Sequence, residues 1–291
     1  MRGAFLAVDW GTTNRRVYLI GGDGSVEQTE RDDRGVLTIE PGAFAAEAGA
    51  IRSRFGDLPM LCAGMIGSNR GWANVPYVDC PAGFDRLAAG VHWVEPGRTA
   101  IVPGLALRTD ARADVMRGEE VQFLGAAAAG IVPLDALLCQ PGTHCKWGRL
   151  AGGALVDFTT AMTGELFALL RRHSLLSEQL DGPIDDDGAF GEGVEAARSR
   201  DLLAHLFGAR AAMLLGSRSR EASASYVSGL LIGSDVAAHG GGEGAEVHIL
   251  ADPVLGALYG RAIAMTGGRP TVVDSHSAFV AGILRIWELM T

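Results

Sequence analysis

The sequence predicts an α/β protein made of two copies of one unit, because a glycine-threonine turn occurs twice. Gly11–Asn14 follows the apolar run 5–8, and Gly142–His144 follows the apolar run 136–139. The offset of 131 positions between these turns also aligns Gly21-Gly22 with Gly152-Gly153. With 291 residues, 48% of them hydrophobic, the chain is long enough for two domains of ordinary size.

Each copy is expected to form strand, turn, strand, glycine-rich turn and strand. Alternating apolar residues bounded by turn signals predict the strands of the first half, and Pro41 marks the start of its helix. The strands are expected over 4–9, 15–20, 25–31, 59–63, 91–94 and 100–102, and the helix over 41–55. Residues 64–83 show no periodicity, and a loop that long inside a compact domain is usually functional or disordered. Its Trp72 and Tyr77 argue against disorder.

The second half is predicted to repeat the three strands and to add several helices. A helix over 114–130 leads into it. Strands are expected over 135–140, 145–150, 154–160, 247–251 and 271–273, and helices over 164–180, 192–215, 220–239, 252–265 and 275–289. Asp252 would cap its helix with Pro253 at the first position. Leu202, Leu203, Leu206 and Phe207 have the spacing of one buried helix face.

Charge and cysteine usage narrow the class of protein. The net charge is −9 without a basic cluster, which argues against nucleic-acid binding, and no apolar run reaches the length of a membrane span. Cys62, Cys80, Cys139 and Cys145 form no CxxC pair, and the first strand follows Met1 closely, so a reduced, cytoplasmic setting is expected. The acidic run 185–187 is expected to be a solvated loop.

The paired turns predict a phosphotransferase. Glycine lets a backbone approach a ligand closely, and successive N–H groups in such a turn form a concavity for an anion. Two such hairpins in duplicated halves can hold a polyphosphate from both sides. This arrangement is typical of the two ribonuclease H-like lobes, with a cleft between them, of the actin/hexokinase-like ATPases. We expect an N-terminal lobe over 1–108 that carries the loop 64–72, here called the acceptor loop, and a C-terminal lobe over 109–291 that completes the ATP site.

Asp9, at the end of the first strand, can hold Mg²⁺ at the triphosphate or cap the amides of the turn. Lys146 can neutralise charge on the transferred phosphoryl group, or it is a surface lysine of a strand. The residues expected to bind ATP are Asp9, Gly11, Thr12, Thr13, Asn14, Gly142, Thr143 and His144. His144 is expected to be structural or to donate to phosphate, rather than to bind a metal, because no second ligand has suitable spacing.

Asp114 begins the predicted helix at the junction of the halves. A carboxylate there can take the proton of the attacking hydroxyl, although Asp is also a good helix N-cap. Glu119 and Glu120 are rival bases.

The loop after the strand 59–63 is suited to a small polar acceptor. Its glycines expose N–H groups, and Arg70 or Arg16 can pair with a carboxylate or form an ordinary surface ion pair. The residues expected to bind the acceptor are Arg16, Gly67, Ser68, Asn69, Arg70 and Trp72.

Six motifs occur in order along the chain: DWGTTNRR (9–16), GMIGSNRGW (64–72) with PYVDCPAG (76–83), IVPG (101–104), DVMRGEE (114–120), PGTHCKW (141–147) and FTTAMTGE (158–165). Together they resemble the 2-dehydro-3-deoxygalactonokinase family of the sugar-kinase, heat-shock-protein-70 and actin superfamily. The resemblance implies ATP- and Mg²⁺-dependent phosphorylation of 2-dehydro-3-deoxy-D-galactonate at its 6-hydroxyl, with closure of two lobes. The partner is then a small sugar acid, and a homodimer is compatible with it.

Two departures from the superfamily pattern are visible. Gln140 stands where the second motif usually carries an aspartate, which leaves Asp9 as the expected metal carboxylate. The region around Ala251 lacks the glycines of the usual adenosine motif. A kinase of another hexose or amino sugar, and a non-catalytic actin-like nucleotide-binding protein, are the alternatives.

Overall fold

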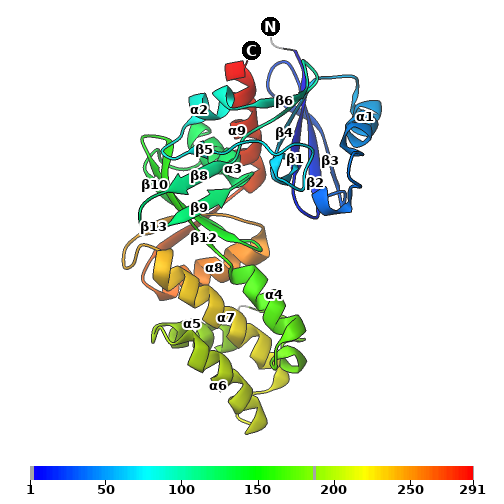
Figure 1. Ribbon diagram of the computed structural model, residues 1–291. Coiled ribbons are helices and arrows are strands. Elements are labelled where there is room, and N and C mark those ends of the chain that lie inside the picture. Colours follow the sequence, from blue (N-terminus) through cyan, green and yellow to red (C-terminus); the bar gives the residue numbers. More distant parts are fainter. Residues whose placement is uncertain (1–2, 186–187, 291) are drawn as a thin grey trace. The chain divides into compact units, whose positions relative to one another are not determined.

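The computed structural model describes residues 3–185 and 188–290, so part of the acidic run 185–187 lies outside it (Figure 1). The chain divides into two compact units. The first takes in Met1–Asp135, Leu150–Phe158 and Ser275–Thr291, and the second Ala136–Arg149 and Thr159–Asp274. The two lobes expected over 1–108 and 109–291 are defined by the ligands that they bind, and this division stays a prediction.

The first unit is built on a six-stranded sheet of order β3-β2-β1-β4-β7-β6. β1 pairs antiparallel with β2 and parallel with β4, and β4 pairs parallel with β7. The elements are β1 (Phe5–Trp10), β2 (Arg15–Ile20), β3 (Val26–Asp32), η1 (Val36–Thr38), α1 (Phe44–Phe55), β4 (Met60–Ala63), η2 (Met65–Gly67), β5 (Val78–Asp79), α2 (Phe84–Ala89), β6 (His92–Glu95), β7 (Thr99–Ile101), β8 (Leu105–Arg108), β9 (Ala113–Met116), α3 (Glu119–Ala128) and α9 (Ser275–Met290).

The alternation of side chains along β1 decides which face of this sheet carries chemistry. Trp10 packs on α1, with its ring 5.9 Å from that of Phe44. Phe5 faces the other way and stacks on Trp287 of α9 at 4.6 Å, so α1 and α9 cover opposite faces (Figure 1). Because side chains alternate along a strand, Asp9 shares the face of Phe5 and lies on the α9 side.

The prediction of a helix over 114–130 is wrong for its first residues. Ala113–Met116 is strand β9, which pairs antiparallel with β8 in a small sheet of order β5-β8-β9, and α3 begins only at Glu119. Gly118, at φ 109°, separates strand from helix. The partner strand of β9 therefore overrides the local helical pattern, and Asp114 is not a helix cap.

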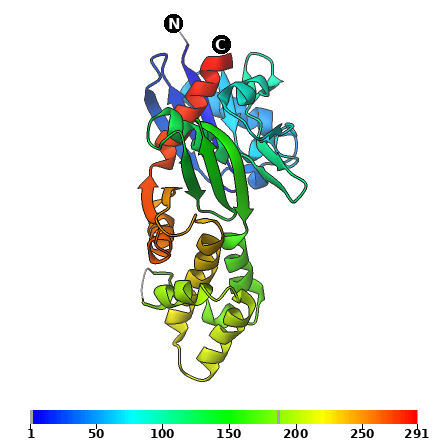
Figure 2. The same cartoon turned by 90° about the vertical axis from the view of Figure 1, so that its left-hand side faces the viewer.

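A second sheet repeats the topology of the first. It has the order β12-β11-β10-β13-β14, which matches β3-β2-β1-β4-β7 position by position and confirms the predicted duplication. Most of its residues belong to the second unit, but Leu150–Phe158 of β11 and β12 are grouped with the first. Helix α7 packs against α4, α5, α6 and α8 (Figure 2). The elements are β10 (Ala136–Gln140), β11 (Cys145–Ala151), β12 (Ala154–Ala161), α4 (Thr163–His173), η3 (Ser177–Gln179), α5 (Gly188–Ala197), α6 (Leu202–Leu214), α7 (Arg220–His239), β13 (Glu246–Leu250), α8 (Pro253–Met265) and β14 (Arg269–Val273).

Two long predicted helices are broken in the structure, whereas the cap of α8 is confirmed. The helix over 164–180 ends at His173, and the helix over 192–215 is split into α5 and α6. Arg200, at φ 59°, ends the first segment, and the Asp201 carboxylate caps α6 by accepting from the N–H of Ala204 at 3.2 Å. Asp252 accepts from the N–H groups of residues 254 and 255, as predicted for α8.

The predicted buried face of α6 is only half right. Leu202 and Leu206 pack against the core of the second unit, but Leu203 and Phe207 are exposed. Elsewhere in the described residues, no helix combines the length and the apolar character needed to cross a bilayer.

Candidate active site

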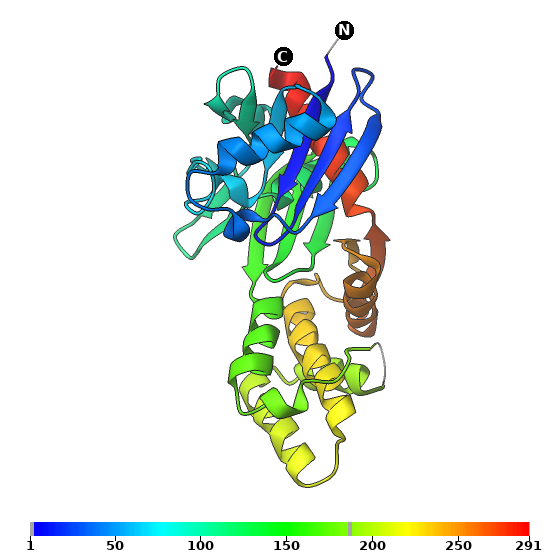
Figure 3. The same cartoon turned by 90° about the vertical axis from the view of Figure 1, so that its right-hand side faces the viewer.

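The first glycine-threonine turn joins β1 to β2, which are blue in Figure 3. It leaves the N–H groups of Thr12 and Thr13 available for an anion. The Gly11 N–H closes the turn onto the Asn14 carbonyl at 2.9 Å. The carbonyls of residues 11, 12 and 13 accept from the N–H groups of residues 36, 37 and 35 of the segment around η1. Within the described chain, the exposed Thr12 and Thr13 donate no backbone hydrogen bond, so their N–H groups can point at phosphate oxygens.

Three charged side chains meet beside this turn. Asp9 is the direct cross-strand neighbour of Arg16 and interacts electrostatically with Glu119 at the start of α3. Burial raises the pKa of Asp9 to about 6, with Glu119 raising it further and Arg16 opposing the shift. Arg16 also contacts His276 at the start of α9. The first unit thus brings Asp9, Arg16 and the first turn together.

Two glycines allow three backbone segments to meet at this end of the sheet. A Cβ on Gly64, at φ 97°, would lie 2.7 Å from the Trp10 carbonyl oxygen. A Cβ on Gly118, at φ 109°, would lie 3.1 Å from the Cα of Gly64. Both positions therefore require glycine. This close approach places the N-terminus of α3 and the start of the acceptor loop next to the end of β1.

The two glutamates of α3 have different environments. The N–H of Gly118 donates to both carboxyl oxygens of Glu120, at 2.9 and 2.7 Å, and burial raises the pKa of Glu120 to about 8. Glu119 is partly exposed and accepts from the Arg117 N–H at 3.1 Å. Asp114 lies on β9, where its carboxylate accepts from the N–H of Val115 at 2.7 Å. Glu119 is therefore the carboxylate next to Asp9, and Glu120 is a buried structural acid.

The acceptor loop divides into structural and exposed residues. Ser68 is buried, and its hydroxyl donates to the Met65 carbonyl at 2.6 Å. Trp72 stacks on Phe44 at 6.5 Å and packs on the core, while Asn69 and Arg70 are exposed. Gly67 is buried, in contact distance of Arg117. Their roles in acceptor binding stay predictions.

Sequence reasoning missed Arg117. Its side chain is 7% exposed, donates from Nη2 to the Val75 carbonyl at 2.8 Å and lies 4.3 Å from the centre of the Tyr77 ring. Its Nε and Nη1 atoms are buried without a hydrogen-bond partner among the described residues. No local sequence pattern predicts that Arg117 is buried, because its contacts come from residues about forty positions earlier.

In the second unit, the turn at Gly142 is held by the start of α4. The Thr143 carbonyl accepts from the N–H of Glu165 at 2.9 Å, and the Glu165 carboxylate contacts Nε2 of His144. A Cβ on Gly164 would lie 2.4 Å from the Gly142 carbonyl oxygen. Lys146 is buried in β11. Gly142, Thr143 and His144 thus lie in one turn of this unit, and Lys146 follows on β11.

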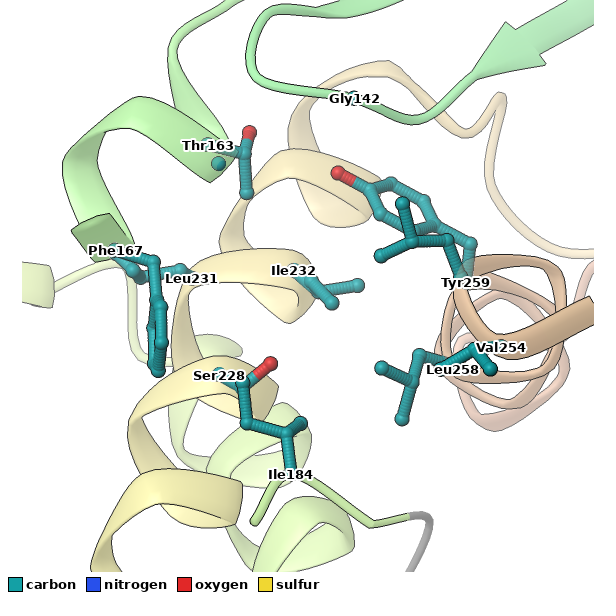
Figure 4. Close-up of a pocket in the computed structure, with 12 residues that line it drawn as sticks. Gly142, Thr163, Phe167, Ile184, Ser228, Leu231, Ile232, Val254, Leu258 and Tyr259 are labelled. Atoms are coloured by element: carbon teal, nitrogen blue, oxygen red, sulfur yellow. The ribbon is translucent and has the colours of Figure 1, made fainter. Parts of the chain in front are cut away.

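A buried carboxylate and an apolar pocket lie next to this second turn. Asp235 of α7 accepts from Nε1 of Trp147 at 2.8 Å, from the Thr163 hydroxyl at 2.8 Å and from the Tyr259 hydroxyl at 2.9 Å. The pocket has a volume of about 180 Å³ (Figure 4). Its lining residues are Gly142, Thr163, Gly164, Phe167, Ile184, Ser228, Leu231, Ile232, Val254, Leu255, Leu258 and Tyr259.

No group of three or more His, Cys, Asp or Glu side chains with metal-binding geometry occurs in the described chain. This does not conflict with the magnesium prediction, because Mg²⁺ commonly takes one or two carboxylates and fills its remaining positions with water and substrate phosphate.

Comparisons with known proteins identify the family. The sequence profile described as "2-keto-3-deoxy-galactonokinase" matches residues 9–286. The chain is 36% identical over 292 residues to the 2-dehydro-3-deoxygalactonokinase of Escherichia coli (strain K12), covering 98% of each chain. It is similar to the crystal structure of a candidate 2-dehydro-3-deoxygalactonokinase from Sinorhizobium meliloti, with a TM-score of 0.87, 34% identity and coverage of 97% of each chain.

A more distant structure shares only the fold. The activator of 2-hydroxyisocaproyl-CoA dehydratase from Clostridium difficile, solved with bound ADPNP, matches with a TM-score of 0.50 at 12% identity, covering 98% of this chain and 95% of that one. Together with the duplicated sheet topology, this supports the predicted actin/hexokinase-like ATPase fold.

Proposed function

Because the chain belongs to the 2-keto-3-deoxy-galactonokinase family, we propose that it transfers the terminal phosphoryl group of ATP to the 6-hydroxyl of 2-dehydro-3-deoxy-D-galactonate. The products are ADP and the 6-phosphate of the sugar acid. The observation that carries this proposal is the family match over 9–286, supported by a carboxylate and free N–H groups at the first turn.

Positioning and charge neutralisation supply most of the catalysis in phosphoryl transfer. The N–H groups of Thr12 and Thr13 would hold phosphate oxygens from the first unit, with the Asn14 amide beside them. The second turn would contribute Gly142, Thr143 and His144, and Lys146 would offset charge on the transferred group. Strands flank both turns and Lys146 lies on β11, so little reorganisation is needed during reaction.

Asp9 fits a magnesium ion. It is a partly buried carboxylate whose charge is destabilised by its surroundings and by Glu119, and a nearby cation would relieve both effects. Asp9 would hold Mg²⁺ directly or through water. When bound, the ion neutralises phosphate charge and orients the triphosphate.

Glu119 is the base that the geometry favours. It is partly exposed and lies beside Asp9, whereas Glu120 has both oxygens on the Gly118 N–H. In the proposed step the 6-hydroxyl oxygen attacks the terminal phosphorus, its proton passes to Glu119, and the bond to the ADP oxygen breaks. Asp114, our prediction from sequence, remains the rival.

The apolar pocket of the second unit is our candidate for the purine. It adjoins the Gly142 turn, and Val254, Leu255 and Leu258 of α8 line it in place of a glycine-rich adenosine motif. Apolar walls with a few polar groups at the rim are typical of sites for planar ligands. For the acceptor carboxylate, we propose Arg16 or Arg70, with the underused guanidinium of Arg117 as a third candidate.

A substrate panel tests the proposed activity. ATP turnover would be measured by a coupled assay with 2-dehydro-3-deoxy-D-galactonate, its gluconate epimer, glucose and an amino sugar. We expect the galactonate derivative to give the highest kcat/KM. Preference for a neutral sugar would instead make the chain a kinase of another hexose. Slow ATP hydrolysis that no acceptor changes would favour the alternative of an actin-like nucleotide-binding protein without an acceptor substrate.

A pair of variants tests the base. Glu119→Gln is expected to lower kcat by about 10²- to 10⁴-fold, while Asp114→Asn stays close to the parent protein. If circular dichroism shows both variants to be folded and Asp114→Asn has the larger loss of kcat, Asp114 is the base.

A further inference from the structure

Helix α6 exposes an apolar face that its own unit does not cover. Four large apolar side chains of α6 and of the turn that follows it are more than half exposed: Leu203 (80%), Phe207 (64%), Leu214 (65%) and Leu215 (83%). The opposite side of the helix, with Leu202 and Leu206, already packs on the core of the second unit. A helix that is apolar all round is normally buried on both sides.

The exposed face runs along the helix and carries one strongly basic residue. At 100° per residue, Leu203, Phe207 and Leu214 fall within about 40° of one another around the helix axis. Arg210 falls about 20° from Leu203 in the same stripe, and it is the single acidic or basic residue between positions 202 and 217 other than His205. Small residues lie beside the stripe at Ala204, Gly208 and Ala211. A row of large side chains next to a row of small ones forms a ridge and a groove.

We propose that α6 pairs antiparallel with α6 of a second copy of this chain, with the two-fold axis just after Gly208. A two-fold interface uses the same patch on both subunits, so each ridge must fit the groove of its own copy. With the axis at this place, Leu203 of one chain lies opposite Leu214 of the other. Phe207 then lies opposite Arg210 of the other chain, whose guanidinium can pack on the ring, and Gly208 beside it lets the backbones approach closely.

Size and charge favour a second copy as the occupant. The exposed face amounts to on the order of 500 Å² per chain, so a dimer would bury about 1,000 Å², the lower limit for a specific interface. Antiparallel pairing brings Asp201 at the start of one α6 toward the exposed Arg220 beyond the end of the other. It also opposes the two helix dipoles favourably.

A membrane surface fits this face less well. Helices that lie on membranes carry many Lys and Arg residues on the face opposite the apolar one. Here the opposite face of α6 is committed to the protein core, Arg210 is the one strongly basic residue between positions 202 and 217, and the chain carries a net charge of −9.

Sedimentation velocity over a range of concentrations tests the proposal. We expect the parent protein to sediment as a dimer, and Phe207→Asp and Leu203→Asp each to raise the dimer dissociation constant by about 30-fold or more. Leu134→Asp, at a similarly exposed leucine in the first unit, should leave the dimer intact. A monomeric parent protein, or a dimer indifferent to both α6 changes, would overturn the proposal. Circular dichroism checks folding, since both altered side chains are exposed.

Cross-linking tests the register. Cys62, Cys139 and Cys145 are buried, so Cys80→Ser provides a suitable background. Gly208→Cys has space for its side chain, because a Cβ at this position would meet nothing within 4 Å. Diamide should convert two such thiols into an intersubunit disulfide. Leu215→Cys, about 20 Å from its copy in this register, should not cross-link. Equal cross-linking at both positions would indicate parallel pairing and contradict the proposal.

Discussion

The two glycine-threonine turns share a strand framework but have different surroundings. At the same offset, Asp9 corresponds to Gln140 and Arg16 to Trp147. In the first unit this face carries the charges of Asp9, Arg16 and Glu119. In the second unit Trp147 is buried and bonded to Asp235. Duplication has therefore kept the backbone and changed the chemistry. In the proposed reaction, the first copy handles the ion and the proton, and the second supplies a rigid, apolar wall for the nucleotide.

Breaking the buried network of the second unit should have the largest effect. Asp235→Ala leaves the donors of Trp147, Thr163 and Tyr259 without their acceptor. We expect the free energy of unfolding to fall by about 3–5 kcal/mol, measured by urea denaturation. The matched change on the surface, Asp57→Ala, should cost less than about 1 kcal/mol, because Asp57 forms only an exposed ion pair. Equal losses would remove the structural role of Asp235.

Replacing Asp9, whose counterpart in the second turn is the uncharged Gln140, should nearly abolish activity. Asp9→Asn is expected to lower kcat by about 10²- to 10³-fold, since it removes a fixed charge at the phosphates. Gln140→Asn at the corresponding position should change kcat by less than about tenfold. Steady-state kinetics at saturating ATP compares them. Similar losses at both positions would mean that the turns share the ionic role.

The pH dependence of stability gives a further test of Asp9. Its folded pKa of about 6 lies above the ordinary 3.8, so the folded protein holds the proton more tightly. This favourable contribution is complete below pH 3.8 and is lost as the pH rises through 6. The parent protein should therefore lose up to about 3 kcal/mol relative to Asp9→Asn between about pH 4 and 7. Parallel curves from urea denaturation would show that Asp9 is not perturbed.

The glycines that hold each turn should show a smaller, paired effect. A Cβ on Gly35 would lie 2.3 Å from the backbone of Thr13, and one on Gly164 would lie 2.4 Å from the Gly142 carbonyl oxygen. Gly35→Ala and Gly164→Ala are each expected to cost about 1–3 kcal/mol and to raise KM for ATP. Gly49→Ala, in open space on α1, should instead stabilise by about 0.5–1 kcal/mol. Unchanged KM values in both turn variants would argue against phosphate binding there.

The repeated elements were predictable because their signals are local. The turns, the strands beside them and the Asp252 cap depend on residues a few positions apart. Asp114 was misplaced because the partner of β9 decides its conformation. The spacing of Leu203 and Phe207 marks an apolar face without saying what covers it. The burial of Arg117 depends on Val75 and Tyr77, and such distant contacts leave no trace in the local pattern.

The place of α9 in the chain has a consequence for biosynthesis. This helix packs on β1 through Trp287 and Phe5, which stand near opposite ends of the sequence. The first unit therefore cannot complete its core until α9 has been translated and has left the ribosome, whereas the second unit, encoded within it, can fold earlier. Loss of α9 would leave one face of β1 without the helix that packs on it.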